Sequence, residues 1–123
     1  MENEIWKDIE GYEGMYQVSN LGRVRSLDRY ITKPHPRNGV LTRYFQRGTV
    51  IVCHVKRNGY VGVMLKVGGN KKNFMVHRLV AKAFVPGFFE KADVNHKDCN
   101  RANNRADNLE WLTRRDNLMY ADA

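Results

Sequence analysis

The residues of this chain that could do chemistry gather in one polar segment, residues 93–117. Asn95 and His96 are adjacent, Asn108 follows after a polar loop, and Asn117 comes last. Histidine is the side chain that exchanges protons near neutral pH, so His96 is a candidate acid–base group. Any one of the asparagines alone would indicate only a turn, because asparagine commonly hydrogen-bonds its own backbone there. The order of these residues is therefore the informative feature.

Two short strands and a helix are expected to position these side chains. The strands are expected at residues 93–97 and 108–112, with a polar loop at 98–107 between them. Thr113 and Asp116 have the spacing of an N-terminal capping box, which predicts a helix from residue 114. Asn117 would then lie in the first turn of this helix, where it can face the strand pair.

A second helix is expected just before this unit, over residues 76–85. Its apolar residues recur at helical spacing, and Pro86 with Gly87 would end it. His77 would lie in its first turn. A lone histidine at such a place is more often structural than catalytic, and both roles stay open here.

The residues before the helix predict mainly strands. Residues 5–27 read as a compact β unit with one apolar face, and residues 49–76 read as a three-stranded meander. Asn58-Gly59 is a strong hairpin-turn signal, since both residues tolerate positive φ. Residues 28–48, with their prolines, glycines and scattered arginines, read as a basic loop with room for one short strand.

Charge indicates the class of partner. The chain of 123 residues has 21 Lys and Arg against 13 Asp and Glu, which gives a net charge of +8 at pH 7. Basic side chains replace the counterions condensed on phosphate, so such a domain favours nucleic acid. A merely basic soluble protein and attraction to an acidic membrane surface are the alternatives. No apolar run approaches the roughly 18 residues of a membrane span, so no membrane association is expected.

The two cysteines indicate a reducing compartment. Cys53 and Cys99 lie far apart and form no CxxC pair, which disfavours both a disulfide framework and a structural zinc site. A chain of this length predicts one domain or two small lobes.

Three segments together resemble one family. VNHKDCNRANNRADNLEWLTRRDN resembles the HNH motif of phage-type homing endonucleases, a ββα-metal nuclease site. WKDIEGYEGMYQVSNLGRVRSL resembles the DNA-binding module that accompanies such nucleases, and FMVHRLVAKAFVPG resembles the helix that precedes the HNH motif. The resemblance implies an α+β fold, in which an antiparallel β-rich DNA-binding region (residues 1–75) precedes a helix and the HNH nuclease region (residues 76–123).

The resemblance also implies roles for individual residues. His96 would be the general base that activates water, and Asn108 would bind backbone across the loop to hold the two strands. Asn95 and Asn117 would give oxygen ligands to a divalent cation, Mg²⁺ or Mn²⁺. The expected partner is double-stranded DNA. Its expected contacts are Arg23, Arg25, Lys56, Arg57, Lys66, Lys71, Lys72, Arg114 and Arg115.

Some of these basic residues have plainer interpretations. Lysines also protect exposed sheet edges, and Arg114 with Arg115 can be a solvated basic turn. Two positions depart from the family pattern. Asn95 stands where some relatives carry an Asp metal ligand, which removes a charge from the metal site. Cys99 stands where relatives carry Gly, so the turn there is expected to be strained or differently shaped.

The expected function is metal-dependent DNA endonuclease activity in the cytoplasm of a phage-infected or bacterial host cell. One HNH site cuts one strand, so a monomer should nick DNA, and a dimer would be needed for concerted double-strand cleavage. The alternative is a catalytically weak or inactive HNH-fold module that only binds DNA, for which Asn95 is the main argument. RNA binding through the basic β surface is a more distant alternative.

Overall fold

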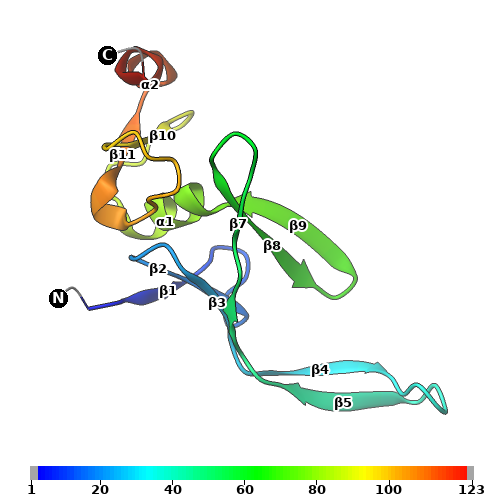
Figure 1. Cartoon of the computed structure of the whole chain (residues 1–123). Helices are drawn as coiled ribbons and strands as arrows, with labels where there is room; N and C mark the ends of the chain where they lie inside the picture. Colours follow the sequence, from blue (N-terminus) through cyan, green and yellow to red (C-terminus); the bar gives the residue numbers. More distant parts are fainter. Residues whose placement is uncertain (1–2, 122–123) are drawn as a thin grey trace.

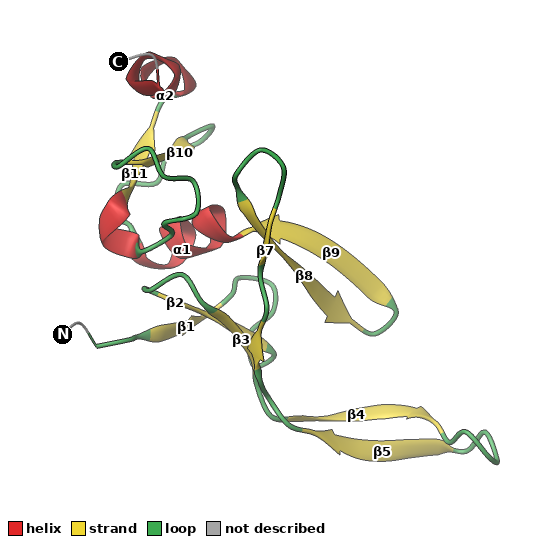
Figure 2. Cartoon of the chain, in the orientation of Figure 1, coloured by secondary structure: helices red, strands yellow, loops and turns green. Residues whose placement is uncertain are grey.

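The structure is a computed structural model that describes residues 3–121, with side chains described as far as residue 117. Its strands are β1 (Trp6–Asp8), β2 (Tyr16–Ser19), β3 (Val24–Ser26), β4 (Arg29–Pro34), β5 (Leu41–Gln46), β6 (Val50–Ile51), β7 (His54–Val55), β8 (Val61–Val67), β9 (Asn70–Met75), β10 (Asp93–His96) and β11 (Leu109–Leu112). Its helices are α1 (Val76–Phe84), a short 3₁₀ turn η1 (Ala106–Asn108) and α2 (Arg114–Ala121). Figure 2 shows strands and loops before α1 and a ββα unit after it, which is the expected α+β arrangement.

The N-terminal sheet has the strand order β1-β2-β3-β6, and its pairs are antiparallel. Val18 and Val24 face each other across β2 and β3 and are fully buried, as the apolar pattern of residues 5–27 predicts. The turn between these strands contains Gly22, whose φ of +89° is the left-handed conformation that glycine adopts without strain. This turn approaches the C-terminal part of the chain.

The prediction of a basic loop over residues 28–48 is wrong. β4 and β5 form an antiparallel hairpin that projects away from the rest of the molecule (Figure 1). The prolines and glycine that suggested a loop lie at the tip or at a strand end, where a missing ladder hydrogen bond costs little. Tyr30 opposite Phe45 and Ile31 opposite Tyr44 supply the aromatic and β-branched cross-strand pairs that stabilise such a ribbon.

The predicted meander exists, but its first strand is much shorter than expected. Residues 49–56 divide between two sheets, because β6 pairs with β3 while β7 pairs with β8. β8 and β9 form the long hairpin of the three-stranded sheet β7-β8-β9. A single β-branched run does not reveal such a change of sheet, since both halves have the same strand propensity.

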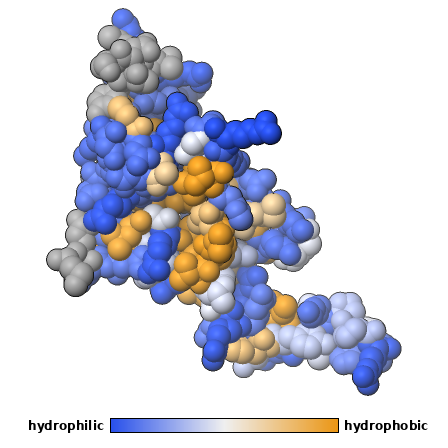
Figure 3. Space-filling model, viewed as in Figure 1, coloured by the Kyte–Doolittle hydropathy of each residue, from blue (hydrophilic) through white to orange (hydrophobic). Residues whose placement is uncertain are grey.

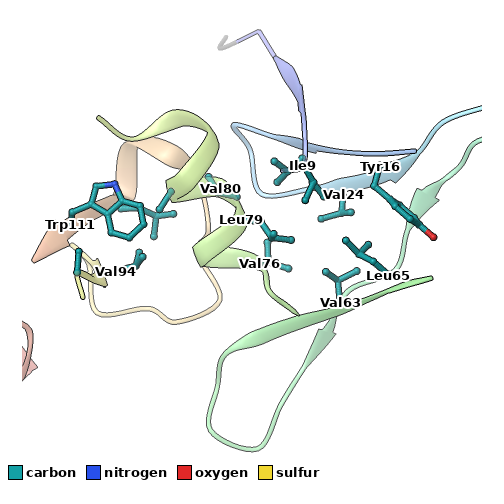
Figure 4. Packing of buried hydrophobic residues seen from close by; sticks show 14 residues of the cluster. Ile9, Tyr16, Val24, Val63, Leu65, Val76, Leu79, Val80, Val94 and Trp111 are labelled. Atoms are coloured by element: carbon teal, nitrogen blue, oxygen red, sulfur yellow. The ribbon is translucent and has the colours of Figure 1, made fainter. Parts of the chain in front are cut away.

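Helix α1 is the centre of the hydrophobic core. Val76 and Val80 are fully buried, and the helix packs against β2, β8, β9, β10 and β11. Figure 4 shows Val94 and Trp111 of the C-terminal hairpin at one end of this packing and Val24 of the N-terminal sheet at the other. The buried side chains of the described residues therefore form one cluster that spans both predicted regions.

The face of the molecule in Figure 3 is largely hydrophilic, with apolar side chains gathered towards its centre. Among residues 3–121, no helix has the length and apolar character to cross a membrane.

His77 is buried near the start of α1, with 8% of its surface exposed. Its ring stacks on Tyr60, with 5.0 Å between ring centroids. Its Nδ1 atom is buried and has no hydrogen-bond partner within the described part of the chain. Burial, followed by the charges of His96 and Arg78, lowers the pKa of His77 from 6.5 to about 4.

This burial predicts a specific loss of stability in acid. The unfolded chain takes up a proton on His77 below about pH 6.5, whereas the folded chain resists it until about pH 4. The free energy of unfolding should therefore fall over this interval, by up to about 3 kcal/mol. Urea denaturation of the wild type and of His77→Phe, which keeps the ring stack, should give curves that diverge as the pH falls. Parallel curves across this pH range would contradict the buried neutral state.

Candidate active site

His96 ends strand β10 and is 5% exposed. Its Nε2 atom lies 2.8 Å from Oδ1 of Asn104, which is buried on the loop that follows. An amide oxygen can only accept a hydrogen bond, so Nε2 must carry the proton when the ring is neutral. Nδ1 is then the nitrogen with a free lone pair, which is the form a general base requires.

A cluster of rings surrounds His96. The His77 and His96 ring centroids are 5.2 Å apart, and those of Tyr60 and His96 are 6.1 Å apart. Arg101 covers the Tyr60 ring at 4.7 Å and donates a 2.6 Å hydrogen bond to the carbonyl oxygen of Asn58. The β7–β8 turn is thus tied to the loop of the HNH segment, and it forms one wall of the site.

Asn108 holds the loop closed by hydrogen bonds at both ends of its amide. Its Oδ1 accepts from the Asp98 backbone N–H at 3.2 Å, and its Nδ2 donates to Asp98 Oδ1 at 3.0 Å and to the Asn103 carbonyl oxygen at 2.9 Å. These are the contacts across the loop that its predicted role requires. The hydrogen bonds from Asn103, Asn100 and Asn108 lower the pKa of Asp98, so this side chain stays an anionic anchor for the turn.

Cys99 adopts the left-handed conformation that a glycine would take without strain, with φ of +63°. Its backbone N–H donates to the carbonyl oxygen of His96 at 2.9 Å, which closes the turn. The turn therefore carries the backbone strain expected for a non-glycine residue, of order 1 kcal/mol.

The two predicted metal ligands differ in their surroundings. Asn95 lies opposite Glu110 in the β10–β11 ladder, and its Nδ2 donates to Glu110 Oε1 at 2.9 Å. Because Nδ2 is engaged, Oδ1 is the end of this amide left to act as a ligand. Asn117 lies in the first turn of α2, a helix that packs against β10 and β11. Thr113 caps this helix as predicted, through a 3.0 Å bond from the Asp116 N–H to its Oγ1.

This donor set fits a hard divalent cation. The amide oxygens of Asn95 and Asn117, and the Glu110 carboxylate that lies beside Asn95, are ligands of the type that Mg²⁺ prefers. No group of three or more His, Cys, Asp or Glu residues that could hold a metal occurs among the described residues.

Arg23, just before β3, and Arg25, within β3, already have partners. Arg23 forms an ion pair with Glu4 and holds the pKa of that carboxyl at about 2. Arg25 donates to Oε1 of Gln17 at 3.0 Å and 2.6 Å and lies over the Trp6 ring at 4.2 Å. Both therefore present fixed rather than freely mobile guanidinium groups, and their contact with DNA stays a prediction.

The other predicted DNA contacts are exposed at three places. Lys56 and Arg57 occupy the β7–β8 turn, close in sequence to Tyr60, whose ring packs beside His77 and His96. Lys66 and Lys71 face each other across the β8–β9 ladder, with Lys72 next to Lys71. Arg114 and Arg115 begin α2. The structure does not gather these residues into one cluster, and their roles stay predictions.

Several residues of the site were not singled out by the sequence. Asn104 and Glu110 contact the predicted site residues directly, and Tyr60 packs beside His96. The segment Asn103-Asn104 gave no signal, because asparagines in a polar loop usually indicate turns. Tyr60 follows the Asn58-Gly59 turn and could be placed at the site only once the turn was known to meet the loop.

Comparison with known proteins agrees with this geometry. A family model described as the NUMOD4 motif matches residues 4–66, and one described as HNH endonuclease matches residues 74–119. The DNA endonuclease I-HmuI of Bacillus phage SP01 is 41% identical over 113 residues, which cover 92% of this chain and 55% of that protein. Two uncharacterized HNH endonucleases of Acanthamoeba polyphaga mimivirus are 32% and 34% identical, over 94% and 98% of this chain but only 29% and 26% of theirs.

A solved structure gives the same result. The chain matches the structure described as "DNA binding and cleavage by the HNH homing endonuclease I-HmuI" with a TM-score of 0.72 and 39% identity, over 97% of this chain and 56% of that one. The chain thus spans about half the length of I-HmuI. The matches cover the predicted DNA-binding module, the helix and the HNH segment in the expected order. The chain therefore belongs to the family of HNH endonucleases that carry a NUMOD4 motif.

Proposed function

We propose that this protein hydrolyses one phosphodiester bond in a strand of double-stranded DNA, with His96 as the general base. The observation that carries the proposal is the 2.8 Å contact between His96 Nε2 and Asn104 Oδ1. It fixes the neutral ring with the lone pair on Nδ1, in a buried position at the end of β10. I-HmuI, described as binding and cleaving DNA, supports the choice of substrate.

In the proposed reaction, Nδ1 of His96 accepts a proton from a water molecule as its oxygen attacks the scissile phosphorus. The bond from phosphorus to the leaving oxygen breaks, and this oxygen takes up a proton from a solvent water molecule. The protonated imidazole is stabilised by its hydrogen bond to Asn104. Asn108 keeps β10 and the loop at a constant spacing, so that His96 stays aligned during the reaction.

Asn95 and Asn117 would hold the cation, Mg²⁺ or Mn²⁺, with Glu110 oriented beside them. A bound divalent cation supplies neutralisation of the negative charge that develops on the phosphate and the leaving oxygen. The charge of the ligand set is low, because two of these oxygens belong to neutral amides. We therefore expect cation binding to be weak without DNA and stronger with it.

The exposed basic side chains would supply the sequence-independent part of DNA binding. The chain has a net charge of +8. Lys56 and Arg57 are exposed on the β7–β8 turn, which forms one wall of the site around His96. One HNH site implies nicking by a monomer, with a dimer required for concerted double-strand cleavage. Action in the cytoplasm of a phage-infected or bacterial host cell is consistent with two free cysteines.

The same fold could bind DNA without cleaving it, and the neutral Asn95 at the cation site favours this second candidate. Supercoiled plasmid separates the two functions. With Mg²⁺ or Mn²⁺, the wild-type protein should produce open circles, and EDTA should abolish them. His96→Ala should lower the nicking rate at least about 100-fold, since it removes the general base.

The control for this experiment is His54→Ala, which removes an exposed histidine of β7. It should nick like the wild type. If the wild type shifts duplex DNA on a gel but nicks plasmid with neither cation, the DNA-binding candidate replaces the nuclease. If His96→Ala nicks as fast as the wild type, His96 is not the base.

The cation site can be tested without measuring cleavage. Asn95→Asp should tighten Mn²⁺ binding roughly tenfold in calorimetry, because it adds a negative charge to the ligand set. In the metal-free protein the same change places a second carboxylate against Glu110, so it should lower the melting temperature, and Mn²⁺ should restore it. Unchanged Mn²⁺ affinity in both Asn95→Asp and Asn117→Ala would show that the cation binds elsewhere.

A further inference from the structure

The loop that orients His96 rests on the turn between β2 and β3. The backbone N–H of Ala106 donates to the carbonyl oxygen of Asn20 at 2.8 Å. At Gly22, a Cβ atom would lie 3.1 Å from the Asn104 carbonyl oxygen and 3.2 Å from the Asn104 Cβ atom. The two chain segments are therefore in direct contact at Asn104, the residue that binds the His96 ring.

This turn is itself fixed by Asn3 and Ile5, which precede β1. Oδ1 of Asn20 accepts from the Ile5 N–H at 2.8 Å, and the Asn20 N–H donates to the Ile5 carbonyl oxygen at 3.1 Å. Nδ2 of Asn20 donates to the Asn3 carbonyl oxygen at 3.2 Å. Asn20 is thus held at both its backbone and its side chain, and it offers a rigid acceptor to the loop.

Asn104 has little freedom under these contacts. It is 5% exposed, its backbone lies under Gly22, and its Oδ1 is bonded to His96. Gly22 has a φ of +89°, so a side chain there would both strain the turn and press on Asn104. The close contact and the positive φ together favour glycine at position 22.

We propose that Asn104 is the positioning residue for the His96 base, and that the β2–β3 turn of the NUMOD4 region holds Asn104 in place. The N-terminal sheet then completes the catalytic centre in addition to any part it takes in DNA binding. This inference rests on the proposed function only for its effect on cleavage. The orientation and tautomer of His96 can be measured in the absence of DNA and metal.

The test of Asn104 begins with the imidazole. Nitrogen-15 NMR of the metal-free protein, at a pH where His96 is neutral, reports which ring nitrogen carries the proton. The wild type should show His96 protonated at Nε2. Asn104→Asp keeps an acceptor and should preserve this tautomer. Asn104→Leu removes the acceptor and should give a mixture of tautomers.

The nicking rate should fall in those variants in which His96 is no longer protonated only at Nε2. For Asn104→Leu we expect kcat for nicking to fall about 10- to 100-fold with KM for DNA nearly unchanged, as for other residues that orient a catalytic side chain. Asn73→Leu, at an exposed asparagine of β9 away from this loop, should leave both the tautomer and kcat unchanged. If Asn104→Leu does not fold, Asn104→Ser and Asn104→Ala replace it, with the smaller loss expected for Ser.

The role of the turn is tested by two glycines with nearly equal φ. Gly22→Ala and Gly11→Ala introduce similar backbone strain, at φ values of +89° and +87°, but only position 22 faces Asn104. Gly22→Ala should lose at least as much stability as Gly11→Ala, because its Cβ atom also presses on Asn104 whereas a Cβ at position 11 meets no atom within 4 Å. Only Gly22→Ala should shift the His96 ring resonances and lower kcat, by about tenfold.

The outcomes separate the claim that Asn104 positions His96 from the claim that His96 is the general base. A pure Nε2–H tautomer in the Asn104 variants that lack an acceptor, or equal effects of Gly22→Ala and Gly11→Ala on His96, would overturn the positioning proposal. A mixed tautomer with unchanged nicking would support the positioning contact and contradict the role of His96 as the base.

Discussion

The burial of helix α1 is the constraint on which the rest of the structure depends. Val76 and Val80 are fully buried. The helix touches strands of the N-terminal sheet, of the sheet β7-β8-β9 and of the C-terminal hairpin β10-β11. The C-terminal hairpin β10-β11 has only two strands, and an isolated two-stranded hairpin is marginally stable at best, so it depends on packing against this helix. Packing on one helix joins these sheets into a single core and fixes the distance from the basic strands to the HNH hairpin (Figure 4).

The loop that orients His96 is held mainly by hydrogen bonds rather than by apolar contacts. The loop from Asp98 to Asp107 buries little hydrophobic surface, and its shape depends on Asp98, Asn103 and Asn108 bonding to one another. Such local side-chain bonds satisfy backbone groups that have no sheet or helix partner. The consequence is that His96 is oriented by its neighbours in the loop and, through Asn104, by the turn at Gly22.

The sequence predicts the elements well where periodicity or capping is strong and poorly where tertiary contacts decide. The helix at residues 76–85, the hairpin strands around His96 and the cap at Thr113 all follow from local patterns. The β4–β5 hairpin was missed because its prolines and glycine, which occupy the tip and a strand end, outweighed its alternating aromatic pairs. Asn104 and Glu110 could not be predicted, because their importance comes from a loop conformation and a strand register.

The central claim is that the His96 imidazole takes the proton from the attacking water. Chemical rescue tests it most directly. His96→Gly leaves a cavity of imidazole size at the end of β10, so the variant should nick duplex DNA very slowly. Added imidazole should restore the nicking rate of this variant, and the rate should saturate as the imidazole concentration rises. The nicking rate of the control His54→Gly should not change with imidazole. If His96→Gly nicks DNA at the wild-type rate without imidazole, His96 is not the base and the account is contradicted.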